Sequence, residues 1–348
     1  MQTTSDKKTF NYGFAFLRML MCFLVIFSHF ASPQSENFFS KSLMRLASIP
    51  VPVFMFLAFY LSERIFIANN KDLIRNRIIR IAFPQIAWTF IYWFVQIALQ
   101  IFFNMDFGVN IKSFVWQMFT GHSMSMNTAM WFQIDLLLLT VLYILVFHFF
   151  EAKKGIFILF IFAFAALFAQ YSNINFKLFN QTRWEIRYPF GRFCEMVPYA
   201  VLGFTFAYCD ILEKLKRHRI AALTSLTILM FLLLRFNVIP SAKGFGYSNN
   251  NNLLLATAIT AFAYLLNFEK VNDRQKVVIK IITGHTLGIY CMHLLAGKLF
   301  TIILSKFGLE INDFIFCLVI YAACWTASSL IKFIAIKIHS KYLCQLVD

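Results

Sequence analysis

Two ionisable side chains lie inside the first long apolar run of the sequence, FAFLRMLMCFLVIFSHF (14–30). Arg18 and His29 are eleven residues apart, and eleven helical steps return to within about 20° of the same face. They would lie three turns, or roughly 16 Å, apart in depth. Ionisable groups within a span usually face a bundle interior, so the shared stripe favours a functional pair. The alternative is that Arg18 reaches the inner headgroups while His29 lies at the outer interface.

A second group of basic side chains lies in the segment LIRNRIIRIAFP (73–84). Arg77 and Arg80 are three residues apart and so share a helix face, and Arg75 lies close by. Paired guanidinium groups suit the bidentate binding of phosphates at a membrane surface. An inner loop that is basic because it touches anionic lipid would look the same. Both interpretations stay open on this segment alone.

A third segment, GHTLGIYCMHLL (284–295), carries polar side chains inside a late apolar run. Tyr290 and His293 are three residues apart, so one can orient the other on a helix. A single histidine in a span is often a satisfied packing residue. His29 is a second histidine in the membrane, and this favours a functional role for the pair.

A fourth segment, RWEIRYPFGRF (183–193), lies outside the predicted spans and combines charges with aromatic rings. Arg187 and Arg192 belong to it. Aromatic faces stack on the CH faces of sugars while charged groups pair with their hydroxyls, so the mixture is typical of a glycan-binding surface. The alternative is an interfacial aromatic belt with ordinary loop charges.

These side chains must be positioned by membrane helices. The chain has 348 residues, of which 60% are hydrophobic and 14% charged, whereas a soluble domain carries about 25% charged residues. Apolar runs of about 20 residues recur along it, and in lipid such runs must be helical to satisfy their backbone groups. The sequence predicts an all-α, polytopic membrane bundle with about ten transmembrane helices, near 13–32, 46–67, 81–103, 131–149, 155–170, 194–209, 220–239, 252–268, 283–304 and 314–335.

The basic residues predict the orientation of this bundle. With a cytoplasmic N-terminus, 20 of the 32 Lys and Arg residues fall on inner segments and 11 on outer ones, while Arg18 lies within a span. This asymmetry favours two cytoplasmic termini. Much of the net charge of +16 is then explained by topology, and no nucleic-acid partner is expected. We expect one membrane domain over 1–348 with no soluble C-terminal domain.

Together these segments resemble the acyltransferase 3 family, integral membrane proteins that acylate sugars and glycans. The family's first helix carries an arginine, ten residues and then a histidine, as Arg18 and His29 do. Further segments resemble other features of the family, in chain order. Residues 49–62 resemble its proline- and phenylalanine-rich span, and Arg77, Arg80 and Pro84 resemble its paired arginines followed by a proline. The span led by Trp131 and the segment from Thr286 to His293 resemble its later motifs. The region of Trp131 departs from the pattern, because the nearest acid is Asp135 where several relatives have a glutamate directly after the tryptophan.

The resemblance implies an acyl-CoA donor, usually acetyl-CoA, which approaches from the cytoplasm of a bacterial cell and is a substrate rather than a bound cofactor. It implies a sugar hydroxyl as acceptor, on a surface polysaccharide such as O-antigen or capsule, or on a lipid-linked glycan. No metal is expected, and membrane lipid is the other partner. His29 and Arg18 are then the catalytic residues, with His29 as a general base or an acyl carrier, because an imidazole of pKa about 6.5 suits proton transfer at neutral pH.

The resemblance also divides the remaining residues between the two substrates. Donor phosphates would meet Arg75, Arg77 and Arg80 at the inner surface, where arginine is a suitable partner. Acceptor-binding residues would be Arg187, Arg192, Trp131, Tyr290 and His293. The main alternative function is a glycolipid transporter or flippase that uses the buried Arg and His residues as a pathway. A non-catalytic partner in a glycan-synthesis complex is the third possibility.

Overall fold

The computed structural model describes residues 10–31, 46–103, 110–121, 129–171, 187–235, 250–267 and 272–347, and these residues form helices without a strand among them. The predicted all-α class is therefore confirmed. The helices are α1 (Tyr12–Phe30), α3 (Pro50–Tyr60), α4 (Glu63–Ala68), α5 (Lys71–Phe103), α6 (Ile111–Thr120), α7 (Trp131–Phe149), α8 (Ala152–Tyr171), α10 (Arg187–Tyr208), α11 (Ile211–Lys216), α12 (Arg219–Arg235), α13 (Asn250–Leu266), α14 (Asp273–Thr283), α15 (Thr286–Phe307), α16 (Asp313–Lys337) and α17 (Lys341–Gln345).

The chain is a multi-pass membrane protein. Within the described residues, seven segments are long and apolar enough to cross a membrane: α1, α3 with α4, α5, α7, α8, α15 and α16. The other three predicted spans coincide with α10, α12 and α13, which are also helical. Each of the ten predicted ranges therefore overlaps a helix, while the count of ten membrane crossings stays a prediction.

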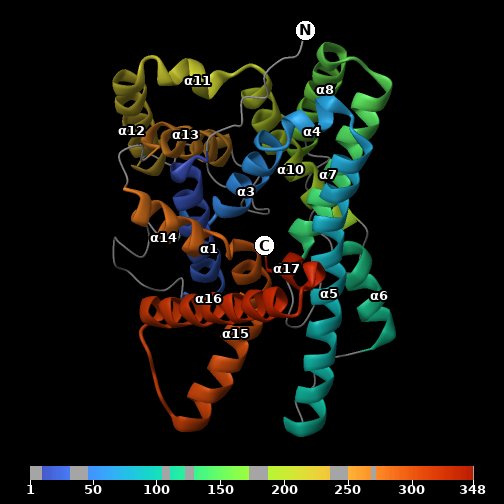
Figure 1. Cartoon of the computed structure of the whole chain (residues 1–348), viewed down its shortest axis with the longest axis vertical. Helices are drawn as coiled ribbons and strands as arrows, with labels where there is room; N and C mark the ends of the chain where they lie inside the picture. The colour runs from blue at the N-terminus through green and yellow to red at the C-terminus, as the bar shows by residue number, and fades with distance from the viewer. Residues whose placement is uncertain are drawn as a thin grey trace.

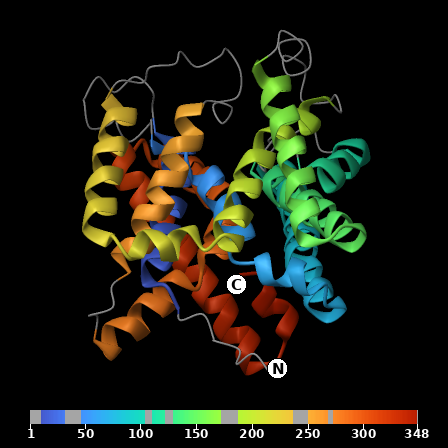
Figure 2. The same ribbon diagram turned by 90° about the horizontal axis from the view of Figure 1, so that it is seen from above.

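Helix α1 lies at the centre of one half of the molecule. It contacts α3, α13, α14, α15 and α16, and its buried side chains include Leu17, Met21 and Ile26. Gly13 permits the approach to α13, because a Cβ at this position would lie 1.8 Å from the carbonyl oxygen of Ala263. Helices α12 and α13 lie side by side at one edge of this half (Figure 2).

The other half consists of α5, α7, α8 and α10, and α3 joins the two halves. Helix α3 packs along α10 as well as against α1. The close approach to α10 depends on Gly203, where a Cβ would lie 2.2 Å from the carbonyl oxygen of Phe56. Helix α5 has 33 residues and runs along the long axis of the molecule in Figure 1, with Pro84 inside it. The C-terminal α17 packs between α16 and α5.

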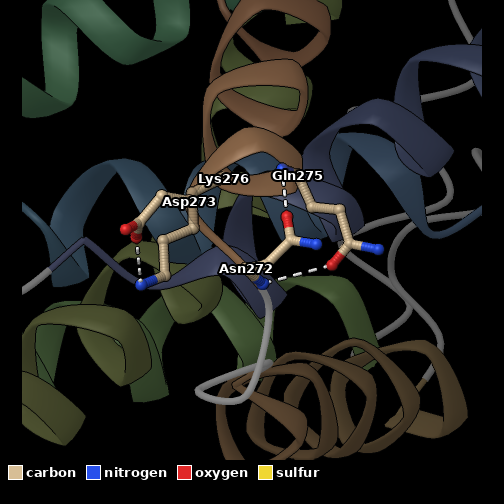
Figure 3. A network of polar contacts seen from close by, with 4 residues as sticks. All are labelled: Asn272, Asp273, Gln275 and Lys276. Carbon is tan, nitrogen blue, oxygen red and sulfur yellow. Dashed lines mark hydrogen bonds and ion pairs between the residues drawn. The ribbon is translucent and has the colours of Figure 1, made fainter.

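The short helix α14 leads directly into α15 and has a strong N-terminal cap (Figure 3). The Asn272 side chain accepts the backbone N–H of Gln275 at 2.9 Å, and the Gln275 side chain accepts the N–H of Asn272 at 3.2 Å. This reciprocal pairing is a capping box and satisfies two free backbone donors. The Asp273 carboxylate also bonds Lys276 at 3.0 Å, and this raises the pKa of Lys276. The start of α15 is thus preceded by a well-defined helix.

Candidate active site

Arg18 contacts the first residue of α15. Its Nη2 atom donates to the Thr286 Oγ1 atom at 2.6 Å, and the Arg18 side chain is half-buried. One turn further along α1, the thiol of Cys22 donates to the Thr286 carbonyl oxygen at 3.4 Å. Two α1 side chains therefore hold the N-terminus of α15 in place. A guanidinium bound to a neutral hydroxyl keeps its full charge, so it remains available to an anion.

His29 also contacts α15, two turns of α15 beyond Thr286. Its ring centroid lies 5.3 Å from that of His293, with 44° between the ring planes. The two rings differ in accessibility, because His29 is exposed and His293 is fully buried. The face of α1 that carries Arg18 and His29 thus packs against α15 at both positions. Arg18 contacts Thr286 and His29 contacts His293.

Helix α15 is fixed from its other side by α5. The Tyr92 hydroxyl donates to the Cys291 carbonyl oxygen at 2.7 Å and accepts the backbone N–H of Leu295 at 3.1 Å. Near the start of α15, the C-terminal residues join the same interface. The indole of Trp88 donates to the Leu346 carbonyl oxygen at 3.0 Å, and the backbone N–H of Gly288 donates to that of Val347 at 3.3 Å. α15 is therefore held by α1 on one side, and by Tyr92 of α5 and the C-terminal residues Leu346 and Val347 on the other.

Tyr290 links α15 to the start of α7. Its hydroxyl donates to the Ala129 carbonyl oxygen, and its ring centroid lies 5.6 Å from that of Phe132 and 5.8 Å from that of His293. Trp131, the first residue of α7, directly precedes Phe132. Tyr290 therefore connects His293 with Phe132 at the start of α7.

Trp131 belongs to a buried charged cluster, which comprises Trp131, Asp135, Arg192 and Glu195. The Arg192 guanidinium lies over the Trp131 ring at 5.0 Å from its centroid and bonds Glu195 at 3.1 Å. Asp135 lies one turn after Trp131, and its electrostatic partners are Arg192 and Glu195. The Oδ2 atom of Asp135 is buried without a hydrogen-bond partner among the described residues. Two acids, one arginine and an indole face each other here, which is a set of groups suited to hydroxyls.

The three inner arginines take different positions on α5. Arg77 turns inward, where its Nε atom donates to Thr140 Oγ1 at 3.2 Å and its Nη1 atom donates to the hydroxyl of Ser62. Its guanidinium also lies over two phenylalanine rings of α3 and α4, at 5.4 and 5.1 Å from their centroids. Arg75 and Arg80 are exposed, and Arg75 lines an open hollow of about 550 Å³ together with Lys71 and His148. Arg77 and Arg80, which were predicted to share a helix face, thus point differently: the Arg77 side chain turns inward and the Arg80 side chain is exposed.

Arg187 begins α10, and its side chain lies outside the described residues. Among the described residues, no group of three or more His, Cys, Asp or Glu side chains could hold a metal ion.

Comparison with known proteins settles the family. The model of the acyltransferase 3 family, described as an acyltransferase domain, matches residues 11–331. The chain belongs to the acyltransferase 3 family. The match runs from the start of α1 into α16 and so includes both contacts between α1 and α15. No curated protein and no solved structure matched the chain. As a member of this family it is a membrane acyltransferase.

Several residues of this candidate site were not indicated by the sequence alone. Thr286 was only the first position of a motif, and its bond to Arg18 could not be read from spacing. Glu195 carried a usable signal, because an acid three residues after Arg192 predicts a helical ion pair. Asp135 is the acid nearest Trp131 in the sequence, but only the fold brings it to Arg192.

Proposed function

We propose that this acyltransferase moves an acetyl group from cytoplasmic acetyl-CoA to a sugar hydroxyl of a cell-surface polysaccharide or a lipid-linked glycan. One observation carries the proposal: α1 places an arginine and an accessible histidine on the same neighbouring helix, at two depths. The helical rise between Arg18 and His29 is roughly 16 Å. That is the order of length of a pantetheine arm, so one extended thioester could reach from Arg18 to His29.

The reaction needs one proton transfer. The sugar hydroxyl oxygen attacks the thioester carbonyl carbon, a C–O ester bond forms, and the C–S bond breaks. His29 takes the hydroxyl proton and returns it to the departing thiolate, which leaves as CoA thiol. His29 suits this role because its ring is exposed, whereas the neighbouring ring of His293 is fully buried. A neutral imidazole is a competent base near neutral pH.

The donor enters from the cytoplasmic side in this proposal. Arg75 and Arg80 are exposed on the first turns of α5 and can pair with its phosphates, since guanidinium groups bind phosphate oxygens in bidentate fashion. Arg77 supports them from inside, where Ser62 and Thr140 fix its guanidinium. Arg18 then holds the phosphate end of the pantetheine arm in a drier setting, so that the thioester end extends toward His29.

The acceptor sugar lies on the side of the charged cluster. Trp131 offers an aromatic face, and Asp135, Arg192 and Glu195 offer groups that bind hydroxyls. Phe132, which follows Trp131 in the chain, contacts Tyr290, and Tyr290 in turn contacts His293 beside His29. The location that follows is the bacterial cytoplasmic membrane with both termini inside, where the donor is made and the acceptor is exported.

The proposal is tested by base-labile acetate on total surface glycan. We compare cells that lack the chain with cells that express the wild type, His29→Ala or His218→Ala, each with an N-terminal tag to measure membrane protein level. His218 is an exposed histidine between α11 and α12 and serves as the matched control. The wild type and His218→Ala should restore the ester, whereas His29→Ala should not. Identical ester content with and without the chain would refute acetylation of that glycan.

A further inference from the structure

His293 has one ring nitrogen whose role is fixed and one that is unused. Its Nδ1 atom lies 2.5 Å from the Tyr290 carbonyl oxygen, one turn earlier on α15. A carbonyl oxygen can only accept a hydrogen bond, so Nδ1 carries the proton of the neutral ring. The lone pair of His293 is then on Nε2. That atom is buried and has no hydrogen-bond partner among the described residues.

The unused lone pair lies beside His29. The two ring centroids are 5.3 Å apart with their planes tilted by 44°, and the His29 ring is the accessible one. His293 cannot turn away, because its backbone is part of α15, its Nδ1 atom is bonded, and its side chain is fully buried. Of the two rings, the exposed His29 ring is therefore the one free to turn and present an N–H group to Nε2 of His293.

We propose that His293 is a positioning residue for His29: its Nε2 atom accepts the N–H of His29 and thereby turns the other nitrogen of His29 toward the acceptor hydroxyl. This inference rests on the proposed function and assigns His293 a role other than contact with the sugar. A neutral imidazole has one donor and one acceptor nitrogen, and the partner of the donor decides which nitrogen is the base. When His29 takes up a proton, its bond to His293 is kept, so nothing has to rearrange during transfer.

Two substitutions separate the nitrogens of His293. In His293→Gln the amide oxygen can occupy the place of Nε2 and accept from His29. In His293→Asn the shorter amide reaches only the place of Nδ1 and can replace only the bond to the Tyr290 carbonyl oxygen. The full-length chain is purified in lipid nanodiscs and supplied with acetyl-CoA and with surface polysaccharide extracted from cells that lack the chain. Thiol release and base-labile acetate are measured, with kcat and both KM values, and thermal unfolding is followed in parallel.

We expect His293→Asn to lower kcat by about 10- to 100-fold, the range found when groups that orient ligating histidines are removed. Both KM values should stay near those of the wild type, and His293→Gln should recover most of the lost kcat. Equal kcat for the two variants would overturn the inference, as would a raised KM for the polysaccharide with an unchanged kcat, which would mean that His293 contacts the sugar. A lowered unfolding midpoint that accounts for the whole loss of activity in both variants would also overturn it. Absence of thiol release by the wild type would instead refute the proposed function itself, and this inference with it.

Discussion

At the scale of single residues, the contacts between α1 and α15 pair side chains from two different helices. Arg18 and His29 of α1 meet Thr286 and His293 of α15. The partners are small or neutral, so the arginine charge is not cancelled by an acid at these contacts. This arrangement suits an anionic thioester better than a structural ion pair would.

Substitutions at Thr286 test whether its contact with Arg18 matters for binding of the acetyl-CoA donor. Thr286→Val keeps the shape of the side chain but removes the oxygen that accepts from Arg18, whereas Thr286→Ser keeps that oxygen. A hydrogen bond to a charged group contributes about 1.5 to 3 kcal/mol, so kcat/KM for acetyl-CoA should fall about tenfold or more in the valine variant. The serine variant should stay within about threefold of the wild type on the same grounds. Equal values for the two variants would show that the Arg18 contact does not matter for the donor.

The sequence indicated Arg18, His29 and His293 but not the contacts between them. The eleven-residue spacing of Arg18 and His29 is a local property, so a single helix is enough to align them. Which α15 residue each one meets could not be predicted, because Arg18 and Thr286 are 268 positions apart and only packing decides which helix lies against α1. The same holds for Asp135 and Arg192, which come from α7 and α10.

At the scale of helices, the contacts that matter depend on close backbone approach. Gly203 lets α10 lie directly on α3, and Gly13 does the same for α1 and α13. The major helices were predictable because each one contains an apolar run of about 20 residues, which can be recognised from the local sequence. The short helices α6 and α14 were not predicted, because each lacks a run long enough to give that signal.

Gly203→Ala tests the helix contact between α3 and α10. The added methyl group would meet the backbone of Phe56 at 2.2 Å, and backbone cannot move aside as a flexible side chain can. Overpacking of this kind costs about 1 to 3 kcal/mol, so the midpoint of thermal unfolding in detergent should fall. Ser225→Ala on the exposed face of α12 is the control and should unfold as the wild type does. An unchanged midpoint for Gly203→Ala would mean that the two helices can separate freely.

At the scale of the whole molecule, orientation determines which substrate meets which end of the site. The distribution of basic residues predicts that the start of α5 and the end of α10 face the cytoplasm and that α6 lies outside. The seven cysteines are free thiols, and five of them are buried, which makes thiol labelling selective. The exposed Cys209 lies at the end of α10.

A membrane-impermeant maleimide tests this orientation. Cys209 should stay unlabelled in intact cells and react in inside-out membrane vesicles. Lys112→Cys, on the exposed face of α6, should add labelling in intact cells, because that helix is predicted to lie outside. Labelling of Cys209 from outside, or of the new thiol only in vesicles, would invert the topology and with it the side from which acetyl-CoA arrives.

The pairing of α1 with α15 also has a consequence for how the chain is made. Arg18 enters the bilayer with the first helix, yet its hydroxyl partner lies 268 residues later. At translation rates of roughly 5 to 20 residues per second, that partner emerges on the order of 15 to 50 s afterwards. Through this interval an arginine and a histidine must be kept hydrated or held by the insertion machinery. The nascent protein therefore spends most of its synthesis with half of the proposed site, and we expect acyl transfer to begin only once the ninth predicted span is inserted.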